Sequence, residues 1–184
     1  MRAIEILMQE HRVIERVLDA LDTAASKAAS SEAIGPSFFL DACEFIRGFA
    51  DEFHHMKEEN VLFQTLVEHG MPRNGGPVAV MLAEHEQGRA YTRGLRAAAE
   101  RWAGGDAAAR AEVVDHAQAY TDLLRQHIAK EDNILFPMAA QFLPEDVQEL
   151  VLADFERAEK EHAPPGTRDK FLALATELEA RARR

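Results

Sequence analysis

The chain has 184 residues, 47% hydrophobic and 29% charged, and its 32 acidic residues against 21 basic ones give a formal charge of −11. This length suits one domain with a single core, or one domain with an appendage. The acidic balance argues against a surface that binds nucleic acid, and the lack of a long apolar run argues against a membrane span. One cysteine, Cys43, excludes an internal disulfide. Together with an N-terminus unlike a secretory signal, it predicts a reducing, cytoplasmic setting.

Apolar residues recur at three- and four-residue spacing almost throughout, which predicts helices rather than strands. Clusters of loop-forming residues divide the chain into four long helices, expected at about 2–29, 37–69, 77–102 and 107–141, with a first loop at 30–36. Helices joined by short loops run up, down, up and down, so residues 1–142 are expected to form an all-α four-helix bundle. Two shorter helices, at about 145–162 and 167–182, form a C-terminal extension over residues 143–184. We expect it to cover the apolar face of the second helix at Phe45, Phe49, Met56 and Phe63.

One ten-residue pattern occurs twice. "HHMKEENVLF" begins at His54 and "HIAKEDNILF" begins at His127, and the two align without a gap. Residues four apart lie on one face of a helix, so His54 lies beside Glu58, and His127 beside Glu131. The second and fourth predicted helices therefore each present a histidine and a carboxylate together.

The first and third helices add one histidine each. His11 and His85 lie within the apolar stripes of their helices, at a level that matches the two repeats in an up-down bundle. A single histidine in a core is more often a packing residue than a ligand. Imidazoles and carboxylates gathered from four helices, however, are costly in an apolar core unless something binds them. The pattern predicts a metal site formed by His11, His54, Glu58, His85, His127 and Glu131.

Imidazole mixed with carboxylate suits iron, zinc, copper or manganese. This set exceeds what one tetrahedral zinc needs, and carboxylates from paired helices commonly bridge two metals in helical bundles. Two ions bridged by Glu58 and Glu131 would each receive two histidines and keep open positions for a small ligand.

His11, "FHHMKEENVLF", the "EH" of "LAEHEQGR" and "HIAKEDNILFP" resemble the hemerythrin-like, HHE cation-binding family over roughly residues 5–140. The resemblance implies a four-helix bundle carrying two Fe ions with a bridging oxo or hydroxo group, and the predicted ligands match the family motifs one by one. Oxygen-carrying hemerythrins have a second histidine on the third helix, where this chain has Arg89. The four-His, two-Glu set is more similar to di-iron proteins of iron–sulfur repair and nitric oxide handling, which carry a further cysteine-bearing domain.

Other polar residues share the helix faces of the predicted ligands. Glu15 and Arg89 lie one turn beyond His11 and His85, and Tyr120 should reach a similar level. One hypothesis is a Glu15–Arg89 pair near Tyr120 that forms a polar lid above the metals, with Glu15 also considered as a seventh ligand. The alternative is that Glu15 pairs at the surface while Arg89 extends into solvent. His55 is rotated by about 100° from His54 in an α-helix, so it is expected to face solvent, with a role as a partner behind the ligands as the alternative.

Three functions fit these residues. The first is a non-haem di-iron protein that binds or reduces O2, NO or peroxide, as a sensor, scavenger or oxidoreductase. The second is a non-catalytic iron-binding module for storage, delivery or sensing, and the third is a bundle that metal merely stabilises. The expected partner is a small diatomic molecule or peroxide, without nucleic acid or membrane, and the chain is expected to be a monomer or a homodimer.

Overall fold

The computed structural model describes residues 1–30 and 33–184, and this part of the chain contains helices and no strand. The first bundle helix is α1 (Arg2–Ala29), and the second runs without a break through α2 (Pro36–Phe45), η1 (Ile46–His55), η2 (Glu58–Leu62) and α3 (Phe63–Glu68). The third is α4 (Pro77–Ala103), and the fourth comprises α5 (Ala109–Lys130), η3 (Glu131–Leu135) and α6 (Phe136–Phe142). The η segments are π-helical turns, wider than α-helical ones. The C-terminal helices are α7 (Glu145–His162) and α8 (Thr167–Arg183).

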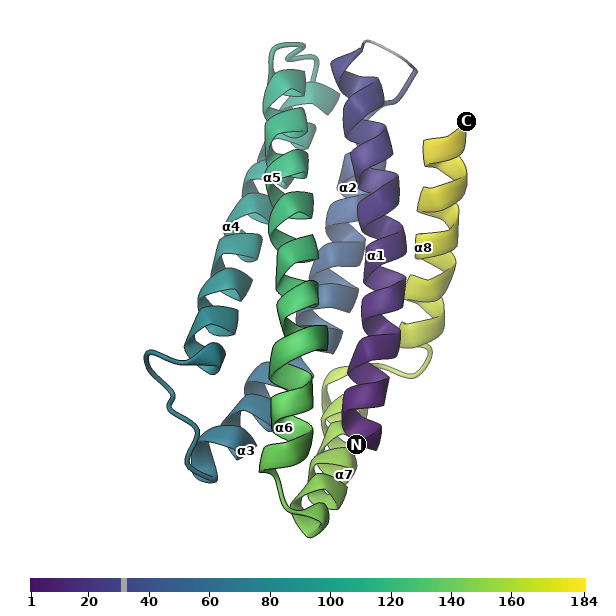
Figure 1. Ribbon diagram of the computed structural model, residues 1–184. Coiled ribbons are helices and arrows are strands. Elements are labelled where there is room, and N and C mark those ends of the chain that lie inside the picture. The colour runs from purple at the N-terminus through teal and green to yellow at the C-terminus, as the bar shows by residue number, and fades with distance from the viewer. Residues whose placement is uncertain (31–32) are drawn as a thin grey trace.

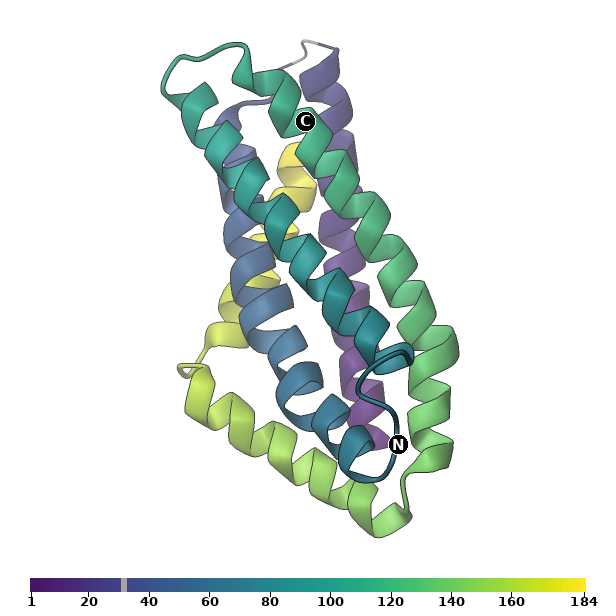
Figure 2. The same ribbon diagram turned by 90° about the vertical axis from the view of Figure 1, so that its left-hand side faces the viewer.

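The predicted fold is confirmed. The four long helices run alternately up and down side by side, as Figures 1 and 2 show. Proline occupies the first helical turn of both α2 and α4, where its missing N–H costs nothing, so Pro36 and Pro77 define these starts as expected. The turn after α4 needs the left-handed conformation of Gly105, whose φ is 100°. The predicted loop at 30–36 includes residues 31 and 32, which lie outside the described residues.

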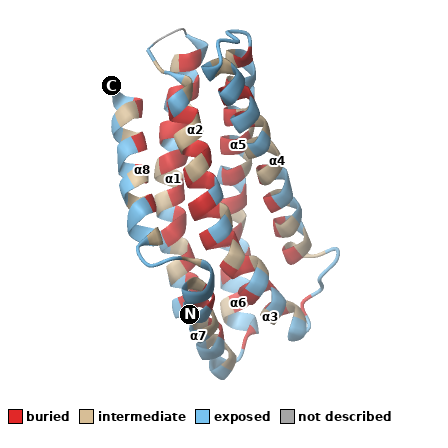
Figure 3. Ribbon diagram, turned by 180° about the vertical axis from the view of Figure 1, so that it is seen from behind, coloured by how far each residue is buried: buried red, intermediate tan, exposed pale blue. Residues whose placement is uncertain are grey.

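Two apolar clusters fill the bundle, one toward each end. One contains Leu21, Phe39 and Leu95, and the other contains Leu7, Leu62 and Phe136. Buried residues form the inward faces of the helices along the whole bundle in Figure 3. Any polar group between the two clusters is therefore shielded from water by packed side chains on both sides.

The C-terminal helices pack against the bundle. α8 runs beside α1, whereas α7 crosses the lower end of the bundle (Figures 1 and 2). Phe171 of α8 is buried, with its ring centroid 6.2 Å from that of Phe45 and 6.3 Å from that of Phe49. Gly48 makes room for this ring, because a β-carbon at that position would overlap it. Among the described residues, no helix combines the length and the apolar character needed to cross a bilayer.

Candidate metal centre

Seven potential ligands meet between the two apolar clusters, and each is at most 5% exposed. They include the predicted set in full, and His55 joins it. His11 comes from α1 and His85 from α4, while His127 lies on the last turns of α5. The other four lie at the edges of π-helical segments: His54 and His55 end η1, Glu58 begins η2 and Glu131 begins η3.

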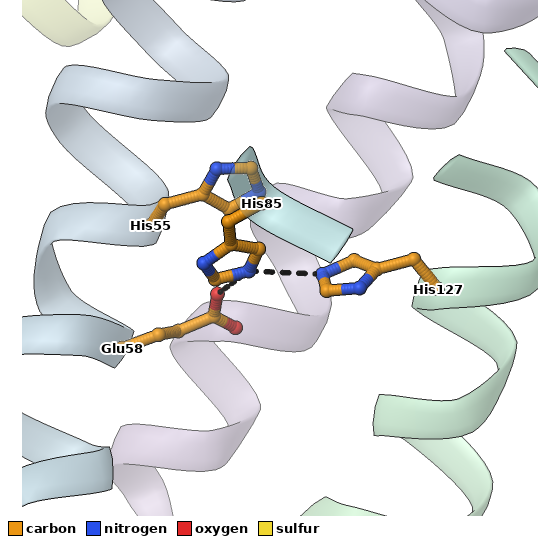
Figure 4. A group of neighbouring side chains, drawn as sticks. All are labelled: His55, Glu58, His85 and His127. Atoms are coloured by element: carbon orange, nitrogen blue, oxygen red, sulfur yellow. Dashed lines mark hydrogen bonds and ion pairs between the residues drawn. The ribbon is translucent and has the colours of Figure 1, made fainter. Parts of the chain in front are cut away.

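These residues form two groups that share Glu58. His55, Glu58, His85 and His127 form one, and His11, His54, Glu58 and Glu131 form the other, with the ligand atoms of each group within 4.8 Å of one another. Figure 4 shows the first group: the His55 ring lies over that of His85, and His127 approaches from the opposite helix. The centroids of the His55 and His85 rings are 3.8 Å apart. We call the first group the three-histidine group and the second the two-histidine group.

Each of the two glutamates reaches histidines of both groups. Glu58 lies 3.3 Å from Nε2 of His54 through Oε1 and 3.5 Å from Nε2 of His85 through Oε2. Oε2 of Glu131 lies 3.2 Å from Nε2 of His11 and 3.3 Å from Nε2 of His127. Each carboxylate thus lies between histidines of the two groups.

The expectation that His55 faces solvent is wrong. His54 and His55 close the π-helical segment Ile46–His55, and both are buried, His55 at 5% exposed and His54 at 1%. Consecutive residues of an α-helix lie about 100° apart, yet both can be buried in a closely packed bundle, as His127 and Ile128 of α5 are.

Every histidine of the centre has a carboxylate behind it. The Nδ1–H of each ring donates a hydrogen bond to that carboxylate, which fixes the ring and turns Nε2 toward the centre. The pairs are His11 with Asp132 (2.7 Å), His54 with Glu10 (2.9 Å), His55 with Asp51 (3.1 Å), His85 with Glu59 (2.7 Å) and His127 with Glu84 (3.0 Å).

A cationic side chain lies behind each of these carboxylates in turn. Arg89 binds two of them, Asp51 at 2.9 Å and Glu59. The remaining pairs are Arg12 with Asp132, Lys57 with Glu10 and Lys130 with Glu84. These ion pairs orient the carboxylates and, through them, the imidazole rings.

Several buried polar atoms of the centre lack hydrogen-bond partners in the part of the chain that the structure describes. Nε2 of His11 and of His54, and both oxygens of Glu58 and of Glu131, are buried without a hydrogen-bond partner among the described residues. Nε2 of His85 faces Nε2 of His127 at 3.1 Å although each ring donates through its own Nδ1. Unpaired buried polar atoms are costly, and cations bound in the two groups would satisfy them. The donor set therefore fits a metal.

A model of the hemerythrin HHE cation-binding domain matches residues 2–139. The chain belongs to this family. Proteins of Mycobacterium tuberculosis and Mycobacterium bovis that carry no functional description are 27% identical to it over 135 residues, which is 73% of this chain and 52% of each relative. The chain thus spans about half the length of these relatives. No solved structure matches it.

Burial shifts the pKa values of the ligands in this hemerythrin-like centre. Desolvation raises the pKa of Glu131 well above its usual range, and the nearby charge of Glu58 raises it further. Desolvation acts in the same direction on Glu58, but the charge and hydrogen bond of His54 and the nearby imidazoles His55 and His11 together lower that pKa to about 2. Desolvation also lowers the pKa of His127 to about 4.

The hypothesis of a Glu15–Arg89 lid is wrong. Glu15 pairs with Arg12 at 3.2 Å on the surface of α1 and belongs to neither ligand group. Arg89 turns instead toward the carboxylates behind His55 and His85. Tyr120 is 2% exposed, and its hydroxyl has no hydrogen-bond partner within the described part of the chain. Burial raises the pKa of that hydroxyl well above its usual value.

The sequence reasoning also missed the carboxylates that orient the histidines, although a signal for them exists. Glu10 directly precedes His11, and Glu84 directly precedes His85, so the first and third helices carry the same Glu-His pair. In addition, Lys57 corresponds to Lys130 and Glu59 to Asp132 in the repeated pattern. The bundle is thus a pseudo-symmetric pair of helical hairpins, one formed by the first and second bundle helices and one by the third and fourth. Each hairpin supplies carboxylates that lie behind histidines of its own helices and behind histidines of the other hairpin.

Proposed function

We propose that the centre binds two iron ions and that the protein binds or reduces a small oxidant there, with O2, NO and hydrogen peroxide as the candidates. The observation that carries the proposal is the donor set itself: five imidazoles and two carboxylates in two groups that share Glu58. Nitrogen and oxygen donors of this kind suit iron, and paired carboxylates are typical of dinuclear sites in helical bundles.

The ligands divide unequally between the ions. His55, His85 and His127 would hold one ion, His11 and His54 would hold the other, and Glu58 and Glu131 would bridge them. The ion with two histidines has fewer protein donors and is the one at which an external ligand would bind. Iron in such a site supplies reversible one-electron chemistry and an open coordination position.

The surroundings favour a very small ligand. The ligand side chains are at most 5% exposed, and apolar clusters containing Leu7 and Phe136 on one side and Tyr120 and Leu124 on the other surround them. A diatomic molecule or peroxide fits such an enclosure, whereas a larger organic substrate would have to displace packed core residues. The same burial disfavours a storage or delivery role, because iron would leave through a closed core.

The presence of His55 changes the comparison with oxygen carriers. The sequence lacks the second histidine of the third helix and has Arg89 there. His55 supplies a fifth imidazole from the second helix instead. Dioxygen therefore stands beside nitric oxide and peroxide as a candidate ligand.

The first test is metal analysis of freshly purified protein, together with visible spectra in air and after anaerobic reduction. We expect about two irons per chain and a spectrum that changes when O2, NO or peroxide is added. Glu58→Ala and Glu131→Ala should each lower the iron content, while Glu68→Ala, at an exposed position near the end of α3, should not. One zinc per chain without colour, or two irons retained in both variants, would contradict the proposal.

A further inference from the structure

Lys57 is a fully buried lysine that joins the C-terminal extension to the metal centre. Its side chain is 0% exposed, and Nζ binds Glu10 of α1 and lies 2.7 Å from Oε1 of Glu159 on α7. The ammonium group also lies 4.0 Å from the centroid of the Phe53 ring. Lysines are almost never fully buried unless they are paired, so these carboxylates account for its position.

The pseudo-symmetry of the bundle shows that this burial is not required by the centre alone. Lys130 is the counterpart of Lys57 and pairs with Glu84, the counterpart of Glu10. Yet Lys130 is 36% exposed, and the described residues give it no second carboxylate. The difference arises because α7 covers Lys57 and contributes Glu159, whereas the corresponding position beside Lys130 is open to solvent.

A continuous chain of polar contacts leads from α7 to the centre. Glu159 shares the ammonium group of Lys57 with Glu10, and Glu10 accepts the Nδ1–H of His54 at 2.9 Å. If Glu159 loses its charge, Lys57 interacts with Glu10 alone and draws more of its electron density. Glu10 then becomes a weaker acceptor for His54, and the imidazole becomes a weaker donor to a cation.

Glu159 is also the residue at which this series of polar contacts reaches the protein surface. A cleft of about 440 Å³ is lined by Phe53, Glu159, Arg168 and the loop that joins α7 to α8. α7 lies beyond the residues that match the family model, which end at 139. Its path across the lower end of the bundle is visible in Figure 2.

We propose that Glu159 is a positioning residue of the metal centre, through which α7 sets how strongly the two-histidine group holds its cation. The effect runs from Glu159 through Lys57 and Glu10 to His54 and leaves the three-histidine group unchanged. The proposal deepens the proposed function, but it requires only that a divalent cation binds at the centre.

The experiment uses Co²⁺, which needs no oxidant chemistry. Full-length protein is loaded with Co²⁺, and its release to excess chelator is followed by the loss of the cobalt spectrum. Glu159→Gln should accelerate one of two release phases by about 10-fold, at the low end of the 10–100-fold effects of residues behind metal ligands. Lys130→Gln acts on the carboxylate behind His127 and should accelerate the other release phase. The two variants together thus assign each phase to one of the two groups.

Two controls separate positioning from packing. Glu161→Gln removes an exposed carboxylate from the same helix and should leave both phases unchanged. Val151→Ala loosens α7 at a buried contact without touching Lys57, and should lower the melting temperature without selecting one phase.

The proposal is overturned if Glu159→Gln leaves both phases unchanged, accelerates both equally, or merely reproduces Val151→Ala. If only one Co²⁺ binds, the dinuclear function fails. The comparison of Glu159→Gln with Val151→Ala on that single phase still decides whether α7 acts through Lys57.

Discussion

Replacing His55 by leucine should weaken cation binding at one of the two proposed sites and leave the other nearly unchanged. His55 is one of three imidazoles in its group, and it has no role in the two-histidine group. Leucine suits the position sterically, because the counterpart on the fourth helix is the buried Ile128. The variant therefore removes one donor and retains His85, His127 and both bridging carboxylates.

The size of the effect follows from the lost donor. Changes to residues that only orient a ligand typically cost 10–100-fold in affinity, which is about 1.4–2.8 kcal/mol. Loss of the ligand itself should cost at least this much at one site and little at the other. Fold stability should change less, because Asp51 keeps its ion pair with Arg89 at 2.9 Å after the histidine is removed.

Calorimetric titration of metal-free protein with Co²⁺ measures both sites at once. We expect one of two binding events to weaken by at least about 10-fold in His55→Leu. His69→Leu serves as the control, since His69 is exposed at the end of α3 and its ring bonds to the carbonyl of Thr65 at 2.8 Å. Two equivalents bound with unchanged affinities would refute the assignment of His55 as a ligand.

Other consequences concern stability. Gly48→Ala should lower the melting temperature by about 2–12 °C, because the new methyl group displaces the packed Phe171 ring and so destabilises the fold by about 1–3 kcal/mol. Gly35→Ala adds a methyl group in open space and should not lower the melting temperature. Glu179→Gln should cost about 0.2–1 kcal/mol at pH 7, since the hydrogen bond from Arg16 lowers the pKa of Glu179. A carboxyl group whose pKa is lower in the folded protein than in the unfolded chain stabilises the fold at pH values above its unfolded pKa. Wild type and variant should therefore converge in melting temperature as the pH falls below about 4. If a cation is bound, its removal by a chelator should lower the melting temperature. It should lower the free energy of unfolding by about 4 kcal/mol when the free cation was present at a thousand times its Kd.

The helices and the clustering of most potential ligands could be predicted from the sequence because they depend on local rules. Apolar spacing fixes which face of a helix is buried, and Pro36 and Pro77 mark the starts of α2 and α4. His54 and Glu58 lie four residues apart, so they face the same way in almost any helical geometry.

The remaining features depend on packing between helices, which residue spacing does not reveal. An α-helical wheel directs His55 away from His54, whereas the centroid of its ring lies 3.8 Å from that of His85 on α4. The carboxylates that bind Arg89, Asp51 and Glu59, lie on the second helix and not on the first, where Glu15 was expected to meet it. One sequence signal did exist, because Asp51 precedes His55 by four residues and forms a His–carboxylate pair with it.

The differences between the two hairpins indicate how two bound ions would come to differ. The repeat gives both halves the same histidine, lysine and pair of acids, which alone would produce two equivalent sites. The second helix carries Asp51 and His55 where the fourth helix carries the buried, apolar Leu124 and Ile128. These differences give the three-histidine group an additional imidazole, so an ion in the two-histidine group would have fewer protein donors. Glu10 and Lys57 lie behind His54 of the two-histidine group, so the C-terminal extension contacts the half of the centre at which the proposed external ligand would bind.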